Sequence, residues 1–289
     1  MSSPGSSRAT TEGSCVWFPL LDGRDWRPIA AISRSRTCAA DVAFASIGPA
    51  IVLARCSKAA PYSSRAEAMT EDTILIQTNT GSVEGDLAVP VRADGLVIFA
   101  HGTGSSRHSK RNRNVAAHLR NAGFATLLMD LLTTQEADEE RYTRHHRFDI
   151  QLLLDRLVAA TDLATSRSDV GGLPVGYFGA STGAAAALAA AARSPDRVRA
   201  VVSRGGRPDL ADGMLPVVTA PTLLIVGGAD GQVIDLNRQA MARMANAEVR
   251  LEIVPNATHL FPEPGALETV SRLAEEWFRT HLDASTSRS

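Results

Sequence analysis

Short apolar runs alternate with amphipathic segments along most of the chain. Four to eight consecutive apolar residues predict a buried strand, and apolar residues at every third or fourth position predict a helix. The predicted strands are 95–102, 124–130, 174–180, 198–203, 220–228 and 249–255, and the predicted helices are 109–122, 148–165, 181–193, 235–247 and 264–282. This alternation predicts an α/β fold, with a mostly parallel twisted sheet and helices on both faces.

The pattern is different towards the N-terminus. Two extended runs within residues 73–90 meet at a Thr-Gly turn and predict an opening hairpin. Residues 1–68 are rich in Ser and show no sustained period of 2 or 3.6, so we expect a disordered N-terminal extension there, a domain over 69–285 and a tail at 286–289. The extension is interpreted as a dispensable tail, a stretch before a true start at Met69, a targeting segment or a small docking element.

Composition limits the partners, the metal sites and the cellular location that we expect. The 289 residues carry a formal net charge of −1, which gives no electrostatic basis for a nucleic-acid partner. We expect no membrane span, because no run reaches roughly 18 uninterrupted apolar residues. Cys15, Cys38 and Cys56 all precede residue 69, so a thiolate metal site is not expected beyond them and a cytoplasmic location is predicted. The oligomeric state is left open.

Residues 179–183, Gly-Ala-Ser-Thr-Gly, fit the pattern G-x-S-x-G between a predicted strand and a predicted helix. A nucleophilic serine needs this sharp turn to lift its Oγ above the sheet, and glycines at ±2 avoid collisions where the strand folds back into the helix. Serine also favours helix N-caps, which is the non-catalytic alternative. We predict that Ser181 is a nucleophile.

Two later loops supply the remaining groups of a triad. Asp230 follows strand 220–228, and His259 follows strand 249–255, which gives the chain order Ser, Asp, His that this chemistry requires on such a fold. Asp209 and Asp130 also stand near strand ends and compete with Asp230 for the role of the acid. A turn aspartate and an incidental surface histidine are the alternatives without function.

The segment His101-Gly102-Thr103-Gly104 follows the first core strand, where one half of an oxyanion hole is commonly supplied by a backbone N–H. We predict the N–H groups of Thr103 and Thr182 as the two donors. For His101 we predict a structural hydrogen-bonding role beneath the loop rather than catalysis.

Four motifs, at 101–104, 179–183, 227–233 and 256–261, together resemble the α/β-hydrolase superfamily, and specifically its dienelactone-hydrolase-like branch. The resemblance extends over about residues 73–282 and implies a hydrolase of carboxylic esters or lactones. Dienelactone hydrolases proper carry a cysteine nucleophile, whereas this chain has Ser181. The serine is a departure that puts the dienelactone substrate in doubt.

The loops around the predicted site bear on the substrate. About sixteen residues separate strands 198–203 and 220–228, which leaves no room for a large cap domain, so we expect an open site for a small soluble substrate. The segments 107–113, 141–147 and 203–209 are rich in arginine, which binds carboxylate or phosphate bidentately. We predict an anionic substrate held by Arg204 and Arg207; the alternative is a solvated basic face balanced by the acidic residues of 135–140.

These predictions combine into two-step acyl transfer through an acyl-enzyme on Ser181, with His259 as base, Asp230 as acid and no metal or organic cofactor. The alternatives are an acyltransferase, other chemistry on the same triad, and a non-catalytic binding protein that keeps the fold.

Overall fold

The computed structural model describes residues 69–282. The predicted N-terminal extension (1–68) and C-terminal tail (286–289) lie outside the described residues.

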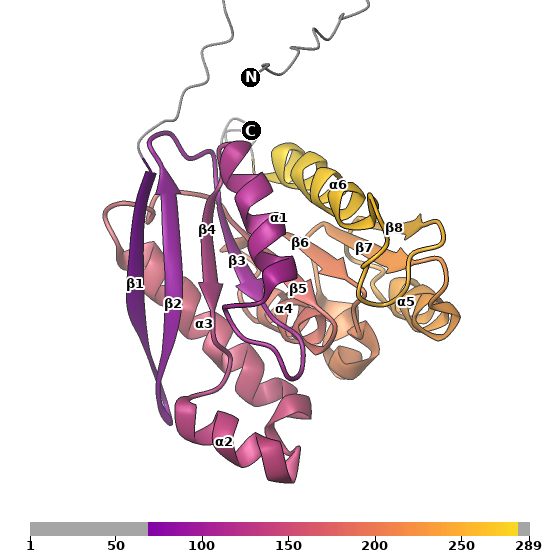
Figure 1. The fold of residues 1–289 in the computed structure, drawn as a ribbon, viewed down its shortest axis with the longest axis horizontal. Helices are drawn as coiled ribbons and strands as arrows, with labels where there is room; N and C mark the ends of the chain where they lie inside the picture. Colours follow the sequence, from indigo (N-terminus) through magenta and orange to yellow (C-terminus); the bar gives the residue numbers. More distant parts are fainter. Residues whose placement is uncertain (1–68, 283–289) are drawn as a thin grey trace, which may run out of the picture. The chain divides into compact units, whose positions relative to one another are not determined.

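An eight-stranded sheet in the order β1-β2-β4-β3-β5-β6-β7-β8 organises the described part (Figure 1). The strands β1 and β2 form the predicted hairpin and pair antiparallel, as do β2 and β4, while β3 to β8 are parallel. The strands are β1 (Met69–Thr78), β2 (Gly81–Pro90), β3 (Leu96–Ala100), β4 (Ala125–Met129), β5 (Val175–Ala180), β6 (Val198–Arg204), β7 (Thr222–Gly227) and β8 (Val249–Val254). The predicted mostly parallel sheet is confirmed.

Helices cover both faces of this sheet. They are α1 (Lys110–Asn121), α2 (Thr134–Thr143), α3 (Ile150–Ser166), α4 (Thr182–Arg193), α5 (Gly231–Arg243) and α6 (Ala266–His281), with 3₁₀ segments η1 (His146–Phe148) and η2 (Pro208–Val217). One buried cluster joins α1 and α6 to one face, and a second joins α3, α4 and η2 to the other. These two clusters bury the short apolar strands from both sides, as expected for parallel strands.

Helix α4 lies in the middle of the second cluster. Its residues from Thr182 to Ala191 are all buried, which leaves this stretch without a solvent-facing side. The run of alanines allows this, because small side chains let a helix lie close to the sheet and to α3 at the same time.

Three elements differ from the predictions. Helix α5 begins at Gly231, four residues before the predicted start, directly after Asp230. Helix α2 was not predicted, because its polar residues give no apolar period; Glu140 is its buried residue. A short 3₁₀ segment, η2, occupies the loop between β6 and β7 where no large cap was expected.

Among residues 69–282, no helix is both long enough and apolar enough to span a bilayer.

Candidate active site

Ser181 occupies a strained turn between β5 and α4. Its backbone angles are φ 51° and ψ −120°, a region that non-glycine residues rarely adopt. Such a conformation costs on the order of 1–3 kcal/mol and persists only where the surrounding structure imposes it. Its side chain makes no capping hydrogen bond to α4, so the geometry does not favour the N-cap alternative.

The two glycines of the motif explain how the turn closes. A Cβ on Gly179 would lie 2.4 Å from the Cα of Ala184, and one on Gly183 would lie 2.3 Å from the carbonyl oxygen of Ala100. Both distances are far below van der Waals contact, so only glycine fits at either position. The glycines therefore let α4 pack against β5 and β3 immediately after Ser181.

Asp230 and His259, 29 residues apart, meet at the carboxyl edge of the sheet. His259 Nδ1 lies 2.7 Å from Asp230 Oδ2, a hydrogen bond that leaves Nε2 free to accept a proton. Asp230 lies between β7 and α5, and His259 lies in the loop after β8, so each side chain projects from the end of a neighbouring parallel strand. The Asp230 side chain is mostly buried (18% exposed), whereas that of His259 is partly exposed (38%).

The backbone brings Ser181 near this pair. Ser181 N–H donates to the carbonyl oxygen of Arg204 at 3.2 Å, and a Cβ on the next residue, Gly205, would lie 3.6 Å from His259 Cε1. Among the described residues, no hydrogen bond joins Ser181 Oγ to His259. Catalytic hydrogen bonds are commonly long in ligand-free enzymes and tighten when substrate binds.

The two competing acids are engaged elsewhere. Asp209 accepts both hydrogen bonds of the Arg207 guanidinium, at 2.8 and 2.7 Å. Asp130 accepts the backbone N–H of Arg107 at 2.8 Å and also pairs with its guanidinium. Asp230 is therefore the carboxylate among the three candidates that contacts His259.

The predicted oxyanion-hole residues also lie together. Thr103 N–H donates to Thr182 Oγ1 at 3.1 Å, and the two hydroxyl oxygens are 3.0 Å apart. Thr182 is the first residue of α4, where the helix dipole places partial positive charge. The Thr103 N–H, one predicted donor, is thus bonded to the side chain of Thr182, whose own N–H is the other predicted donor.

His101 lies beneath this loop in the position predicted for it. Nδ1 lies 3.0 Å from the carbonyl oxygen of Gly102, and Nε2 accepts the N–H of Leu131 at 3.1 Å. Burial lowers the pKa of His101, outweighing the opposing effects of the Gly102 carbonyl and of Asp130. The neutral ring consequently links the loop of residues 101–104 to the end of β4.

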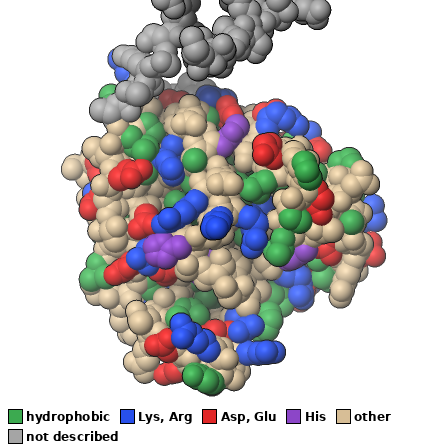
Figure 2. Space-filling model, in the orientation of Figure 1, with side chains coloured by type: hydrophobic (Ala, Val, Ile, Leu, Met, Phe, Trp, Pro, Cys, Tyr) green, Lys and Arg blue, Asp and Glu red, His purple; other side chains and the backbone are tan. Residues whose placement is uncertain are grey.

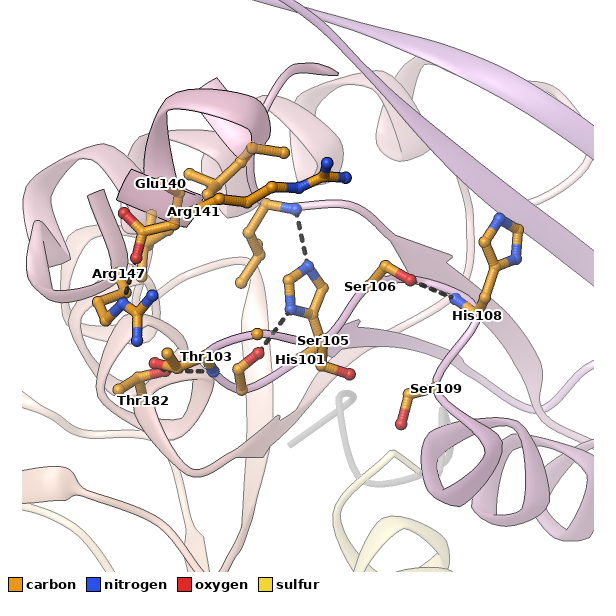
Figure 3. A pocket seen from close by; sticks show the side chains of 16 residues that line it. His101, Thr103, Ser105, Ser106, His108, Ser109, Glu140, Arg141, Arg147 and Thr182 are labelled. Carbon is orange, nitrogen blue, oxygen red and sulfur yellow. Dashed lines mark hydrogen bonds and ion pairs between the residues drawn. The ribbon is translucent and has the colours of Figure 1, made fainter. Parts of the chain in front are cut away.

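A cavity of about 510 Å³ opens beside the two threonines (Figure 3). Leu131, Leu132 and Leu153 form its apolar part, while Glu140, Arg141 and Arg147 of the α2–η1 region form a charged rim. Desolvation would raise the pKa of Glu140, but the hydrogen bonds from Arg147 and from the His146 N–H outweigh it and hold the pKa below its usual value. Glu140 is thereby an ionised partner for Arg147.

The arginine-rich segment 141–147 was expected near the site, and its Arg141 and Arg147 line the cavity. Helix α2, which carries Glu140, was not predicted. Its signal is the segment Thr133–Glu136, which fits the capping box S/T-x-x-E: the Thr133 side chain accepts from Glu136 N, and the Glu136 carboxylate accepts from Thr133 N. That motif would have predicted the start of α2, although not which side chains of α2 reach the cavity.

The two arginines predicted to bind substrate have different environments. Arg207 is ion-paired with Asp209, so its charge is already compensated. Arg204 is the last residue of β6 rather than a loop residue, and it is only 6% exposed.

The chain is similar to the model of one protein family and to several solved structures. The model of the dienelactone hydrolase family matches residues 83–283. A crystal structure of a dienelactone hydrolase from Anabaena variabilis is 55% identical, with a TM-score of 0.72, over 74% of this chain and 99% of that chain. Est1E from Butyrivibrio proteoclasticus shares the fold at 18% identity, with a TM-score of 0.59, over 72% of this chain and 98% of its own.

Curated relatives from two Mycobacterium tuberculosis strains are 54% identical over 214 residues, and both bear the name "Putative phosphoribosyl transferase". The match covers 74% of this chain and 47% of each relative, so the chain spans about half of their length. On the family match and the Anabaena structure, the chain is an α/β hydrolase and belongs to the dienelactone hydrolase family.

Proposed function

We propose that the protein is a serine hydrolase of carboxylic esters or lactones, with Ser181 as nucleophile, His259 as base and Asp230 as acid. The observation that carries this proposal is the strained Ser181 turn beside the Asp230–His259 hydrogen bond of 2.7 Å. A nucleophile at a strand-to-helix turn and a base oriented by a carboxylate are what acyl transfer requires.

The chemistry proceeds in two steps on these residues. Ser181 Oγ attacks the carbonyl carbon while His259 Nε2 takes its proton, and that proton then passes to the departing alcohol oxygen as the ester bond breaks. Water next attacks the acyl-enzyme; His259 takes one of its protons and returns it to Ser181 Oγ as the acid leaves. Asp230 stabilises the imidazolium in both steps without itself being protonated.

The negative charge that develops on the carbonyl oxygen would be held by the N–H groups of Thr103 and Thr182. For this, the Thr103 N–H must give up or share its bond to Thr182 Oγ1. The cavity next to these threonines is of a size suited to a small substrate, with its leucines available for an apolar part.

Labelling with an alkyl fluorophosphonate tests the proposal. We expect stoichiometric labelling of the wild type, none of Ser181→Ala, and strongly reduced labelling of His259→Ala. The matched control is Ser166→Ala, which removes an exposed hydroxyl at the C-terminal end of α3, outside the triad and the cavity. Labelling that persists in Ser181→Ala would contradict Ser181 as the nucleophile, whereas a wild type that is never labelled would favour a non-catalytic binding protein.

The acceptor of the acyl group is part of the same proposal. Water is favoured because the His259 side chain is partly exposed to solvent. Acyl transfer to another nucleophile is the alternative on the same residues, and adding alcohol or amine acceptors to the ester assay separates the two by the product formed.

The name of the Mycobacterium relatives suggests phosphoribosyl transfer as a second function. Less than half of each relative aligns with this chain, so the activity in their name can reside in the part that does not match. The partners that we propose here are small ester or lactone substrates rather than nucleic acid or membrane, in a cytoplasmic setting.

A further inference from the structure

Arg204 is a buried cation without a counterion in the described part of the chain. Its Nε and Nη1 are fully buried and donate to no acceptor there, and no carboxylate pairs with it. Burial, together with the charge of Arg111, lowers the pKa of Arg204 to about 10, which leaves it protonated at neutral pH. Burying a charge unpaired costs free energy, so an anion is expected to approach it.

Arg111 supplies a second cation. It lies in the first turn of α1, its Nε is buried without a hydrogen-bond partner within residues 69–282, and its charge acts on Arg204. By contrast, Arg107 and Arg113 of the same segment pair with Asp130 and Asp86. Figure 2 shows Lys and Arg side chains gathered over the start of α1, where the helix dipole also favours an anion.

Arg204 lies next to Ser181 along the sheet. Arg204 is the register partner of Ala180, and its carbonyl oxygen accepts the Ser181 N–H at 3.2 Å. Its side chain is on the same sheet face as Ala200 and Val202, which pack with α1 and α6. The leucines of the cavity belong to the α3 side, and the cavity also reaches His108 and Ser109, directly before α1 and Arg111.

We propose that Arg204 and Arg111 bind a phosphate-monoester group of the substrate. Two like charges held together without a carboxylate are best neutralised by a doubly charged ligand, and a phosphate monoester carries about −1.5 to −2 at pH 7, whereas a carboxylate carries −1. Guanidinium groups also match phosphate oxygens bidentately. The inference rests on the proposed serine-hydrolase function: the ester lies over Ser181, with the phosphate on the α1 side.

Calorimetric titration with inorganic phosphate at constant ionic strength tests the site directly. We expect the wild type to bind phosphate at least about tenfold more tightly than acetate. In Arg204→Met and in Arg111→Gln, phosphate binding should weaken about tenfold or more. Arg113→Gln is the matched control, because Arg113 lies on the same helix but is paired with Asp86. Phosphate binding no tighter than acetate binding, or equal in wild type and Arg204→Met, would overturn the proposal.

Thermal unfolding separates a binding role from a structural one. Arg204→Met removes an unpaired buried charge, so its Tm without phosphate should equal or exceed that of the wild type, and phosphate should raise the wild-type Tm alone. A structural arginine would give a lower Tm in Arg204→Met and equal shifts with phosphate. That result would count against the site.

Protection of Ser181 connects the site to the reaction. Phosphate should slow labelling by an uncharged fluorophosphonate in the wild type and not in Arg204→Met. If phosphate binds but labelling is not slowed, the site is not part of the substrate site and the proposal fails. If the wild type is never labelled, the hydrolase function fails instead, and the titration still decides whether the anion site exists.

Discussion

The backbone N–H of Thr103 points at the side-chain oxygen of Thr182, 3.1 Å away, across 79 residues of sequence. The two hydroxyl groups are also within hydrogen-bond distance, at 3.0 Å. The Thr182 side chain therefore fixes the position of the loop that is proposed to share the oxyanion with it.

From this pairing we predict that Thr182→Ala lowers kcat of ester hydrolysis about tenfold with little change in KM, because the Thr103 loop loses its anchor while the backbone donor of residue 182 remains. This loss is smaller than the 10²–10³-fold effect of removing a donor itself. Thr182→Ser keeps the hydroxyl and should stay within about threefold of the wild type. Equal kcat values for the alanine and serine variants would contradict the anchoring role.

The acid of the triad can be tested with a matched pair of substitutions. Asp230→Asn should lower kcat/KM for a p-nitrophenyl ester about 10³-fold or more, because the amide no longer stabilises the imidazolium form of His259. Asp209→Asn disturbs only the ion pair with Arg207 and should change kcat/KM no more than about threefold. The reverse ranking would assign the acid to Asp209.

The glycines of the Ser181 turn predict a difference in stability. A Cβ at residue 183 would overlap the carbonyl oxygen of Ala100, so Gly183→Ala should lower the free energy of unfolding by about 1–3 kcal/mol or more. Gly213→Ala is the control, since no heavy atom lies within 4 Å of a Cβ there, and it should change stability by no more than about 0.5 kcal/mol. Urea denaturation measures both, and equal losses would show that the close approach is relieved elsewhere.

His101 predicts part of the pH dependence of stability. Burial holds its pKa in the folded protein below the usual 6.5, so above that pH the ring is neutral in both states and adds no pH dependence. Below it, only the unfolded chain gains the proton, and the free energy of unfolding should fall by up to about 1.4 kcal/mol per pH unit. His101→Asn should lack this component in urea titrations between pH 7 and pH 5. An unchanged slope in the variant would show that His101 does not cause it.

The sequence predicted the sheet well because its strands are short, apolar and buried on both faces, so the signal is local. The G-x-S-x-G motif and the strand-end positions of Asp230 and His259 likewise depend on near neighbours in sequence. Their proximity follows from the parallel arrangement of β5, β7 and β8, whose carboxyl ends share one edge. Their catalytic roles remain predictions.

Other features required three-dimensional information. Helix α2 is stabilised by its capping box and by the ion pair of Glu136 with the buried Arg156, so an apolar period could not reveal it. Arg204 and Arg207 are the same residue type three positions apart. Arg207 is compensated by Asp209, whereas Arg204 is buried with no carboxylate partner among residues 69–282. Strand β6 extends one residue beyond its predicted end and thereby includes Arg204, because Arg204 pairs with Ala180 of β5. No local sequence pattern encodes that pairing.

The burial of α4 from Thr182 to Ala191 has a consequence for the energetics of turnover. A helix held by close-packed methyl groups has little room to shift when charge appears at its first turn. Its peptide dipoles are thus oriented before the reaction begins, and no reorganisation energy has to be supplied at the transition state, unlike in water, where solvent dipoles must first turn. The alanine run would in this way contribute to the rate without any of its side chains meeting the substrate.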